Sequence, residues 1–277
     1  MAQEANSEKL LALAYYNLCN FHQKYVPSQV LQQLMPRGFI MYGPSLERNL
    51  EVGRSLIQKA QITGKSSLYI RGETGSGKTT LAAKLAQESK LLFTQVCTPE
   101  DLVGLSENEK CLHIKKVFED AYDSGSSCLI LDDIERLFAY CPVGPTFSNS
   151  VLQTLLVFLK KRPPPSTNFM IIAISCYNPH EFFRDRFQNA EYSLSHVIED
   201  TGLSKFFDRS IHLGKLSEEE QIKVIKSTKV SNAEEIGIIK TKFPKFTRNE
   251  RSIARLLEII DECRQVGFKP EIFSRED

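Results

Sequence analysis

Residues 67–84 read SLYIRGETGSGKTTLAAK, and this stretch decides the fold. Its first part, Leu68 to Ile70, is an apolar run that predicts a buried strand. Its last part, from Thr80 onward, is rich in alanine, leucine and lysine and predicts a helix. Between them, residues 72–79 fill every position of G-x-x-x-x-G-K-[ST], so the sequence predicts a strand, a phosphate-binding loop and a helix in that order.

The residue types of this loop suit a chain of phosphates. Gly72, Gly75 and Gly77 let the backbone adopt conformations that a Cβ would forbid, so several N–H groups can converge on one anion. Lys78 supplies positive charge to the β- and γ-phosphates for binding and catalysis, and the Thr79 hydroxyl is a ligand for Mg²⁺. An ordinary turn between a strand and a helix is the alternative. The predicted cofactors are ATP and Mg²⁺, and the predicted cofactor-binding residues of the loop are Gly72, Glu73, Thr74, Gly75, Ser76, Gly77, Lys78, Thr79 and Thr80.

Composition and charge exclude some classes of protein. The 277 residues include 25% charged and 42% apolar residues, as in an ordinary globular protein of one or two domains. A net charge of +1 argues against nucleic acid as the main partner, because such surfaces usually carry a basic excess. No apolar run is long enough for a membrane span, and residues 1–9 are too polar for a signal peptide. Seven cysteines without a C-x-x-C pair, and five scattered histidines without metal-ligand spacing, indicate reduced thiols in a cytoplasmic protein.

Strands and helices alternate along the middle of the chain. This alternation predicts a parallel sheet with helices on both faces. After Gly214 the pattern is helical only, with capping boxes that begin at Ser217 and Thr247. The predicted fold is therefore α/β, with an N-terminal helical or linker segment (1–37), a P-loop domain with a parallel five-stranded sheet (38–213) and a C-terminal helical lid (214–277). Besides the first strand, strands are predicted at 91–96, 127–131, 169–174 and 209–213, and helices at 7–25, 45–60, 106–123 and 149–161.

A second motif follows the third predicted strand. Residues 128–133 read CLILDD, four apolar residues and then two acids, which is a Walker B pattern. Asp132 at a strand end can hold Mg²⁺, and Asp133 can orient the water that attacks the γ-phosphate. The alternative is an acid pair that caps the next helix. The loop, Asp132 and Ser175-Cys176 all fall at predicted strand ends, where parallel sheets bind their ligands.

These motifs, taken together, resemble the AAA family of ring ATPases. The resemblance rests on the loop, on VGLSEN at 103–108, on LILDDIER at 129–136 and on the helical lid. GKTTLAAKLAQES, LDDIERL and VLQTLLVFLKKRPP look closer still to the second ATPase domain of the vesicle-fusing ATPases, a branch of that family. The resemblance implies a homo-hexameric ring that binds ATP between subunits. It also implies disassembly of SNARE complexes, reached through an adaptor protein.

Several positions depart from the pattern of an active AAA motor. The second acid is Asp133, one methylene shorter than the usual Glu, so slow hydrolysis is predicted. The positions of the usual arginine fingers align with Leu203 and Phe206. The aromatic residue of the central pore loop aligns with Leu102, which would grip a polypeptide poorly. By resemblance, Lys160 reaches the site of the neighbouring subunit, although a lysine at a helix C-terminus also suits the helix dipole alone.

The remaining predicted site residues come from the same resemblance. Ser175 and Cys176 align with the position that senses the γ-phosphate, although either can simply end the strand. Arg255, or its neighbour Ala254, aligns with the phosphate-contacting position of the lid helix, and pairing with Glu258 is the alternative for Arg255. Residues predicted to hold the adenine, with plain core packing as the alternative, are Ile40, Met41 and Tyr42.

The preferred interpretation is an ATP-binding module that binds ATP tightly and hydrolyses it slowly to support a hexamer. The first rival is an active AAA unfoldase or remodelling motor, which would turn over quickly. A nucleic-acid loader of the AAA type is disfavoured by the balanced charge. A small-molecule P-loop kinase is disfavoured by the helical C-terminal part and the VGLSE segment at 103–107.

Overall fold

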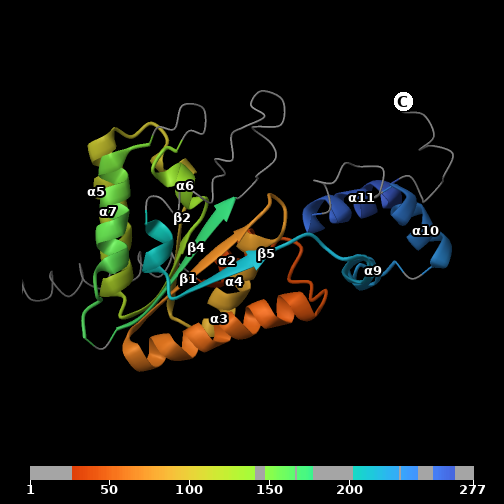
Figure 1. Cartoon of the computed structure of the whole chain (residues 1–277), viewed down its shortest axis with the longest axis horizontal. Helices are drawn as coiled ribbons and strands as arrows, with labels where there is room; N and C mark the ends of the chain where they lie inside the picture. The colour runs from red at the N-terminus through yellow and green to blue at the C-terminus, as the bar shows by residue number, and fades with distance from the viewer. Residues whose placement is uncertain are drawn as a thin grey trace, which may run out of the picture.

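The computed structural model describes residues 27–140, 147–165, 167–176, 202–230, 232–242 and 252–265. Five parallel strands form one sheet in the order β2-β3-β4-β1-β5. Figure 1 labels four of them, β2, β4, β1 and β5. The predicted α/β class and all five predicted strands are confirmed, with ends that differ by up to three residues. The strands are β1 (Lys65–Gly72), β2 (Phe93–Cys97), β3 (Ser126–Leu131), β4 (Asn168–Cys176) and β5 (Arg209–Leu213).

Helices cover both faces of this sheet, and three more lie beyond the end of β5 (Figure 1). The first face carries α2 (Pro27–Leu34), α3 (Pro44–Thr63) and α4 (Lys78–Ser89). The second face carries α5 (Glu107–Asp123) and α7 (Asn149–Lys160). Short turns η1 (Pro99–Leu102), α6 (Ile134–Leu137) and η2 (Leu203–Phe206) connect strands and helices, and the helices of the C-terminal part are α9 (Glu218–Ser227), α10 (Ala233–Lys242) and α11 (Ile253–Gln265).

Alternating side chains of β1, β3 and β4 build two separate cores. Leu68 and Ile70 of β1 pack with α3 and α4, whereas Tyr69 between them packs with the cluster of the second face. In β4, Met170 and Ile172 belong to the first core and Ile171 to the second. Because both faces are covered, the central strand β4 is almost continuously apolar, whereas the edge strand β5 has three exposed polar residues.

Local signals in the sequence set the ends of several helices. Helix α3 ends where Gly64 takes a left-handed conformation, with φ 78°, and donates its N–H to the carbonyl of Ala60. Both ends of the capping box that Ser106 begins are formed at the start of α5, and the same is true of the box that Ser217 begins at α9. The predicted box at Thr247 lies outside the described residues.

Some predictions concern parts of the chain that are not described. The helix at 7–25 and most of the segment 1–37 fall there, as does the stretch 177–201. The boundary at 214 stays a prediction, and buried side chains of α9 and α11 belong to the same core cluster as those of α3 and α4. Within the described ranges, no helix combines the length and apolarity that crossing a membrane requires.

Candidate functional site

The carboxyl ends of three neighbouring strands meet at one edge of the sheet. β4 lies between β3 and β1, and Gly72 at the end of β1 pairs in register with Cys176 at the end of β4. Leu131, which ends β3, pairs with Ala173 of β4. The phosphate-binding loop and Asp132 therefore flank the end of β4, as the strand assignments predicted.

The loop after β1 forms a cradle of backbone with few side chains. Gly75 and Gly77 have φ of 74° and 89°, a left-handed conformation in which a Cβ would be strained. Gly77 precedes α4, and no side chain caps that helix. Lys78 is 4% exposed, and its Nζ donates to the carbonyl of Glu73 at 2.7 Å. The buried Oγ of Ser76 has no partner among the described residues, so the cradle leaves a polar atom for a ligand.

Two predicted metal ligands are in direct contact. The Thr79 hydroxyl donates to Oδ2 of Asp132 at 3.1 Å. Burial raises the pKa of Asp132, and the neighbouring Asp133 carboxylate adds to the rise. A divalent cation between this hydroxyl and this carboxylate would favour the ionised form of Asp132.

Asp133 begins α6 in a left-handed conformation, with φ 45° and ψ 54°. Its side chain makes no capping hydrogen bond. The structure therefore does not show the alternative, in which Asp133 caps the next helix. The carboxylate lies 3.9 Å from Nη1 of Arg136 and lines the same cleft as Lys78 and Thr79. This placement suits an acid that acts on a water molecule at the end of the phosphate chain.

A cleft of about 460 Å³ runs from the loop to an apolar end, which is large enough for a nucleotide. Ile40 and Tyr42 line it together with Leu257 of α11, whereas Met41 is 43% exposed and lines a separate surface hollow. Burial raises the pKa of Tyr42 to about 12. The structure thus brings two of the three predicted adenine-binding residues to the cleft and leaves Met41 outside it.

The lid helix contacts the phosphate-binding loop through its backbone. The N–H of Ala254 donates to the carbonyl of Gly75 at 3.1 Å, and Ala254 lines the cleft. Arg255 does not line it, and its Nη1 lies 3.1 Å from Glu258 and 3.2 Å from Glu262. Pairing with the following turns, the alternative for Arg255, is therefore what the structure shows.

Of the two predicted residues at the end of β4, Cys176 lines the cleft. Ser175 is buried beside it and does not line the cleft. The backbone N–H of Cys176 donates to Oε1 of Glu135 at 2.8 Å. Glu135 is only 4% exposed, and burial raises its pKa to about 7. Glu135, the third acid of the DDIE run, was not among the predicted site residues, and no local pattern in the four-residue helix IERL marks it as buried.

Two further predicted positions lie away from this cleft. Lys160 ends α7 and lines a hollow with Lys65 and Asn168, at the amino ends of the strands. It therefore lies at the opposite edge of the sheet from its own phosphate-binding loop. Leu102 is 3% exposed and packs in the second core, so its side chain is not available to grip a polypeptide, and its neighbour Val103 is 78% exposed.

The remaining loop residues differ in whether they line the cleft. Thr74 and Thr80 line the cleft with the loop residues already described, whereas Gly72 and Glu73 do not, and the Glu73 side chain lies 3.4 Å from Lys215. Leu203, which aligns with an arginine finger, is uncharged and fully buried. It therefore cannot supply a positive charge to a neighbouring subunit.

Comparisons with known proteins agree with this geometry. Residues 68–192 match the model of the ATPase family associated with various cellular activities, AAA. The chain is 35% identical over 243 residues to a vesicle-fusing ATPase of Caenorhabditis elegans, covering 85% of this chain and 27% of that protein. It is 43% identical over 139 residues to a vesicle-fusing ATPase of Dictyostelium discoideum, covering 49% and 19%.

A third relative is the vesicular-fusion protein SEC18 of Saccharomyces cerevisiae, 35% identical over 150 residues that cover 53% of this chain and 20% of that protein. The chain thus spans between 19% and 27% of the length of these three relatives. The family match, the two motifs and the parallel five-stranded sheet around a P-loop lead to one conclusion: residues 68–192 of this chain carry the AAA ATPase domain.

Proposed function

We propose that this chain is the ATP-binding module of a vesicle-fusion ATPase, equivalent to the second ATPase domain of that branch. The observation that carries the proposal is the contact between the Thr79 hydroxyl and the Asp132 carboxylate, beside the buried Lys78. A hydroxyl, a carboxylate and a lysine at the ends of adjacent strands are the set that holds Mg²⁺ and a triphosphate.

In this proposal, residues that line the cleft hold each part of Mg²⁺-ATP. Lys78 leaves the carbonyl of Glu73 to hold the β- and γ-phosphates, and the bare N-terminus of α4 adds its dipole. Ile40 and Tyr42 hold the purine between apolar surfaces. Cys176 lines the cleft beside the place of the γ-phosphate, with Ser175 buried next to it, and Thr79 and Asp132 would hold the metal.

Hydrolysis in this module is slow. Asp133 orients the attacking water, but its carboxylate is one methylene short of the usual glutamate, and a misplacement of about 1 Å costs roughly a hundredfold in rate. Arg255 is held by Glu258 and Glu262, so its charge is directed to the lid and away from the phosphates.

ATP then serves chiefly to join subunits of a homo-hexamer. Lys160 lies too far around the sheet to serve its own loop, so it contacts the nucleotide of a neighbour. A ligand present at about 1,000 times its Kd stabilises the state that binds it by about 4 kcal/mol, and contact across the interface passes that stabilisation to the ring. In the cytoplasm, the assembled protein acts on SNARE complexes through an adaptor.

Two measurements on one set of proteins test this proposal. Light scattering gives the mass of the chain with and without Mg²⁺-ATP, and a phosphate-release assay gives the turnover. Lys160→Ala is compared with Lys161→Ala, because the Lys161 ammonium lies over the rings of Tyr122 and Phe158 in its own subunit. We expect ATP to drive assembly of the wild type and of Lys161→Ala but not of Lys160→Ala.

The rival is an active motor, and the assay separates the two. Turnover of about 1 s⁻¹ or faster is typical of working enzymes and would contradict slow hydrolysis. A wild-type chain that binds ATP yet remains a monomer would contradict the role in assembly.

A further inference from the structure

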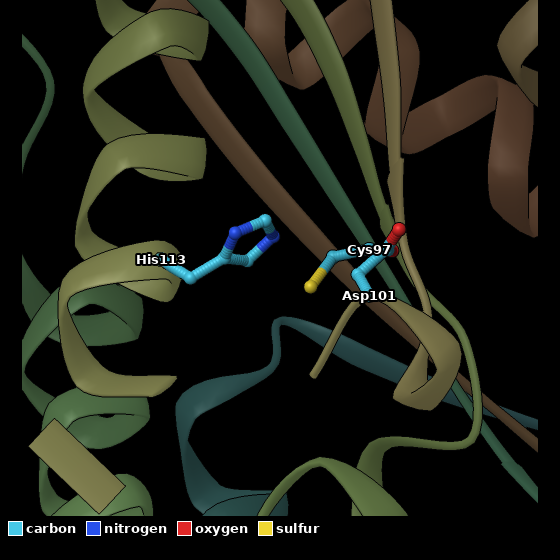
Figure 2. A group of neighbouring side chains, drawn as sticks. All are labelled: Cys97, Asp101 and His113. Carbon is cyan, nitrogen blue, oxygen red and sulfur yellow. The ribbon is translucent and has the colours of Figure 1, made fainter. Parts of the chain in front are cut away.

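Away from the nucleotide cleft, three side chains with different donor atoms converge between β2 and α5. Cys97 ends β2, Asp101 belongs to η1 and His113 lies on α5. One ligand atom of each residue lies within 4.8 Å of the ligand atoms of the other two. Figure 2 shows the His113 ring extending from its helix toward the Cys97 sulfur. No spacing pattern predicts this group, because the three residues do not have metal-ligand spacing in the sequence.

Each of the three residues is held in place by its own element. Cys97 pairs with Leu131 in the ladder between β2 and β3. Oδ2 of Asp101 accepts the Thr98 N–H at 2.7 Å and the Thr98 hydroxyl at 3.0 Å, which orients the carboxylate and leaves lone pairs for a further partner. His113 follows the capped first turn of α5. Ligands on rigid elements are already arranged before a metal binds.

We propose that Cys97, Asp101 and His113 form a binding site for Zn²⁺. Thiolate sulfur, imidazole nitrogen and carboxylate oxygen are the three donor types that Zn²⁺ accepts, whereas Mg²⁺ and Ca²⁺ require oxygen ligands. Three protein ligands leave one tetrahedral position for water. The metal at this site is therefore different from the Mg²⁺ that accompanies ATP.

Binding at this site has two consequences for the rest of the protein. Burial, with the Asp101 charge as second cause, raises the pKa of Cys97 to about 12, so the thiol is protonated at neutral pH and releases a proton when the metal binds. The carbonyl of Cys97 accepts the N–H of Asp132 at 3.0 Å. The metal thus braces the strand end beside the carboxylate that is proposed to hold Mg²⁺.

The test is calorimetric titration of the whole chain, stripped with a chelator, with Zn²⁺ in the presence of excess Mg²⁺. The Mg²⁺ occupies oxygen-rich sites, so the Zn²⁺ isotherm reports sites with sulfur and nitrogen. Cys97→Ala and His113→Gln each remove one ligand, and the side chain that His113→Gln alters is partly exposed. Cys111→Ser is the matched control, because this cysteine lies on α5 two residues before His113.

We expect one Zn²⁺ to bind each wild-type chain and each Cys111→Ser chain, with release of a proton, and the isotherm to be lost in both ligand variants. A Co²⁺ titration should show a thiolate charge-transfer band that Cys97→Ala abolishes. The proposal is overturned if the wild type binds no Zn²⁺. It is equally overturned if binding survives in either ligand variant, since the thiol and the imidazole would then not share a metal.

Discussion

Glu135 should make the stability of this protein depend on pH in a way that one substitution removes. The side chain is 4% exposed, with Oε1 accepting the N–H of Cys176 and Oε2 without a hydrogen-bond partner among the described residues. Burial is the main reason that its pKa is about 7 instead of 4.5, the nearby Asp133 charge adds to the rise, and hydrogen bonds offset part of it. The folded protein therefore retains a proton that the unfolded chain has lost.

The sign of the effect follows from this difference. Below pH 4.5 the carboxyl is protonated in both states, and the full stability is present. Between pH 4.5 and about 7 only the folded state holds the proton, so the free energy of unfolding falls as the pH rises. Each pH unit of the window contributes about 1.4 kcal/mol, which gives a total loss of about 3 kcal/mol above pH 7.

Glu135→Gln keeps an oxygen that accepts the Cys176 N–H and removes the titration. We compare the free energy of unfolding of this variant with that of the wild type at each pH. The difference, variant minus wild type, should be about 3 kcal/mol larger at pH 8 than at pH 4.5. Urea denaturation across this range measures both proteins, and Glu51→Gln on the exposed surface of α3 is the control. Stability curves that run parallel for wild type and Glu135→Gln would refute the reasoning.

Two core substitutions test the packing that positions the site. Leu102→Ala should cost about 2–5 kcal/mol of stability because it empties a buried position, whereas Val103→Ala at an exposed position should change it by about 0.5 kcal/mol or less, as thermal unfolding can show. Equal effects of the two would mean that Leu102 is not part of the core. Gly53→Ala should destabilise by about 1–3 kcal/mol, because a Cβ there would lie 2.3 Å from Cδ2 of Leu85, whereas Gly214→Ala meets nothing within 4 Å and serves as its control in chemical denaturation. A neutral Gly53→Ala would show that the contact between α3 and α4 is looser than the structure shows.

The sequence by itself determined the sheet and the two phosphate-site motifs. Residues 68–86 and 128–133 are continuous runs. Their periodicity, glycines and acids predict strands, a phosphate-binding loop and a metal ligand without reference to residues elsewhere in the chain. Because the motifs end strands of one parallel sheet, their meeting at one edge also followed from the sequence. Capping boxes such as the one at Ser106 were predictable for the same reason, since both members lie within one turn.

Tertiary structure alone decided which side chains meet across that edge. Arg255 and Ala254 are adjacent on one helix, and only the docking of α11 on the loop determines that Ala254 faces the cleft. The burial of Leu102 depends in the same way on a core assembled from several elements. Cys97 and His113 lie 16 positions apart on different elements, and no spacing rule joins them. Such contacts depend on the packing of whole elements, which a local pattern does not contain.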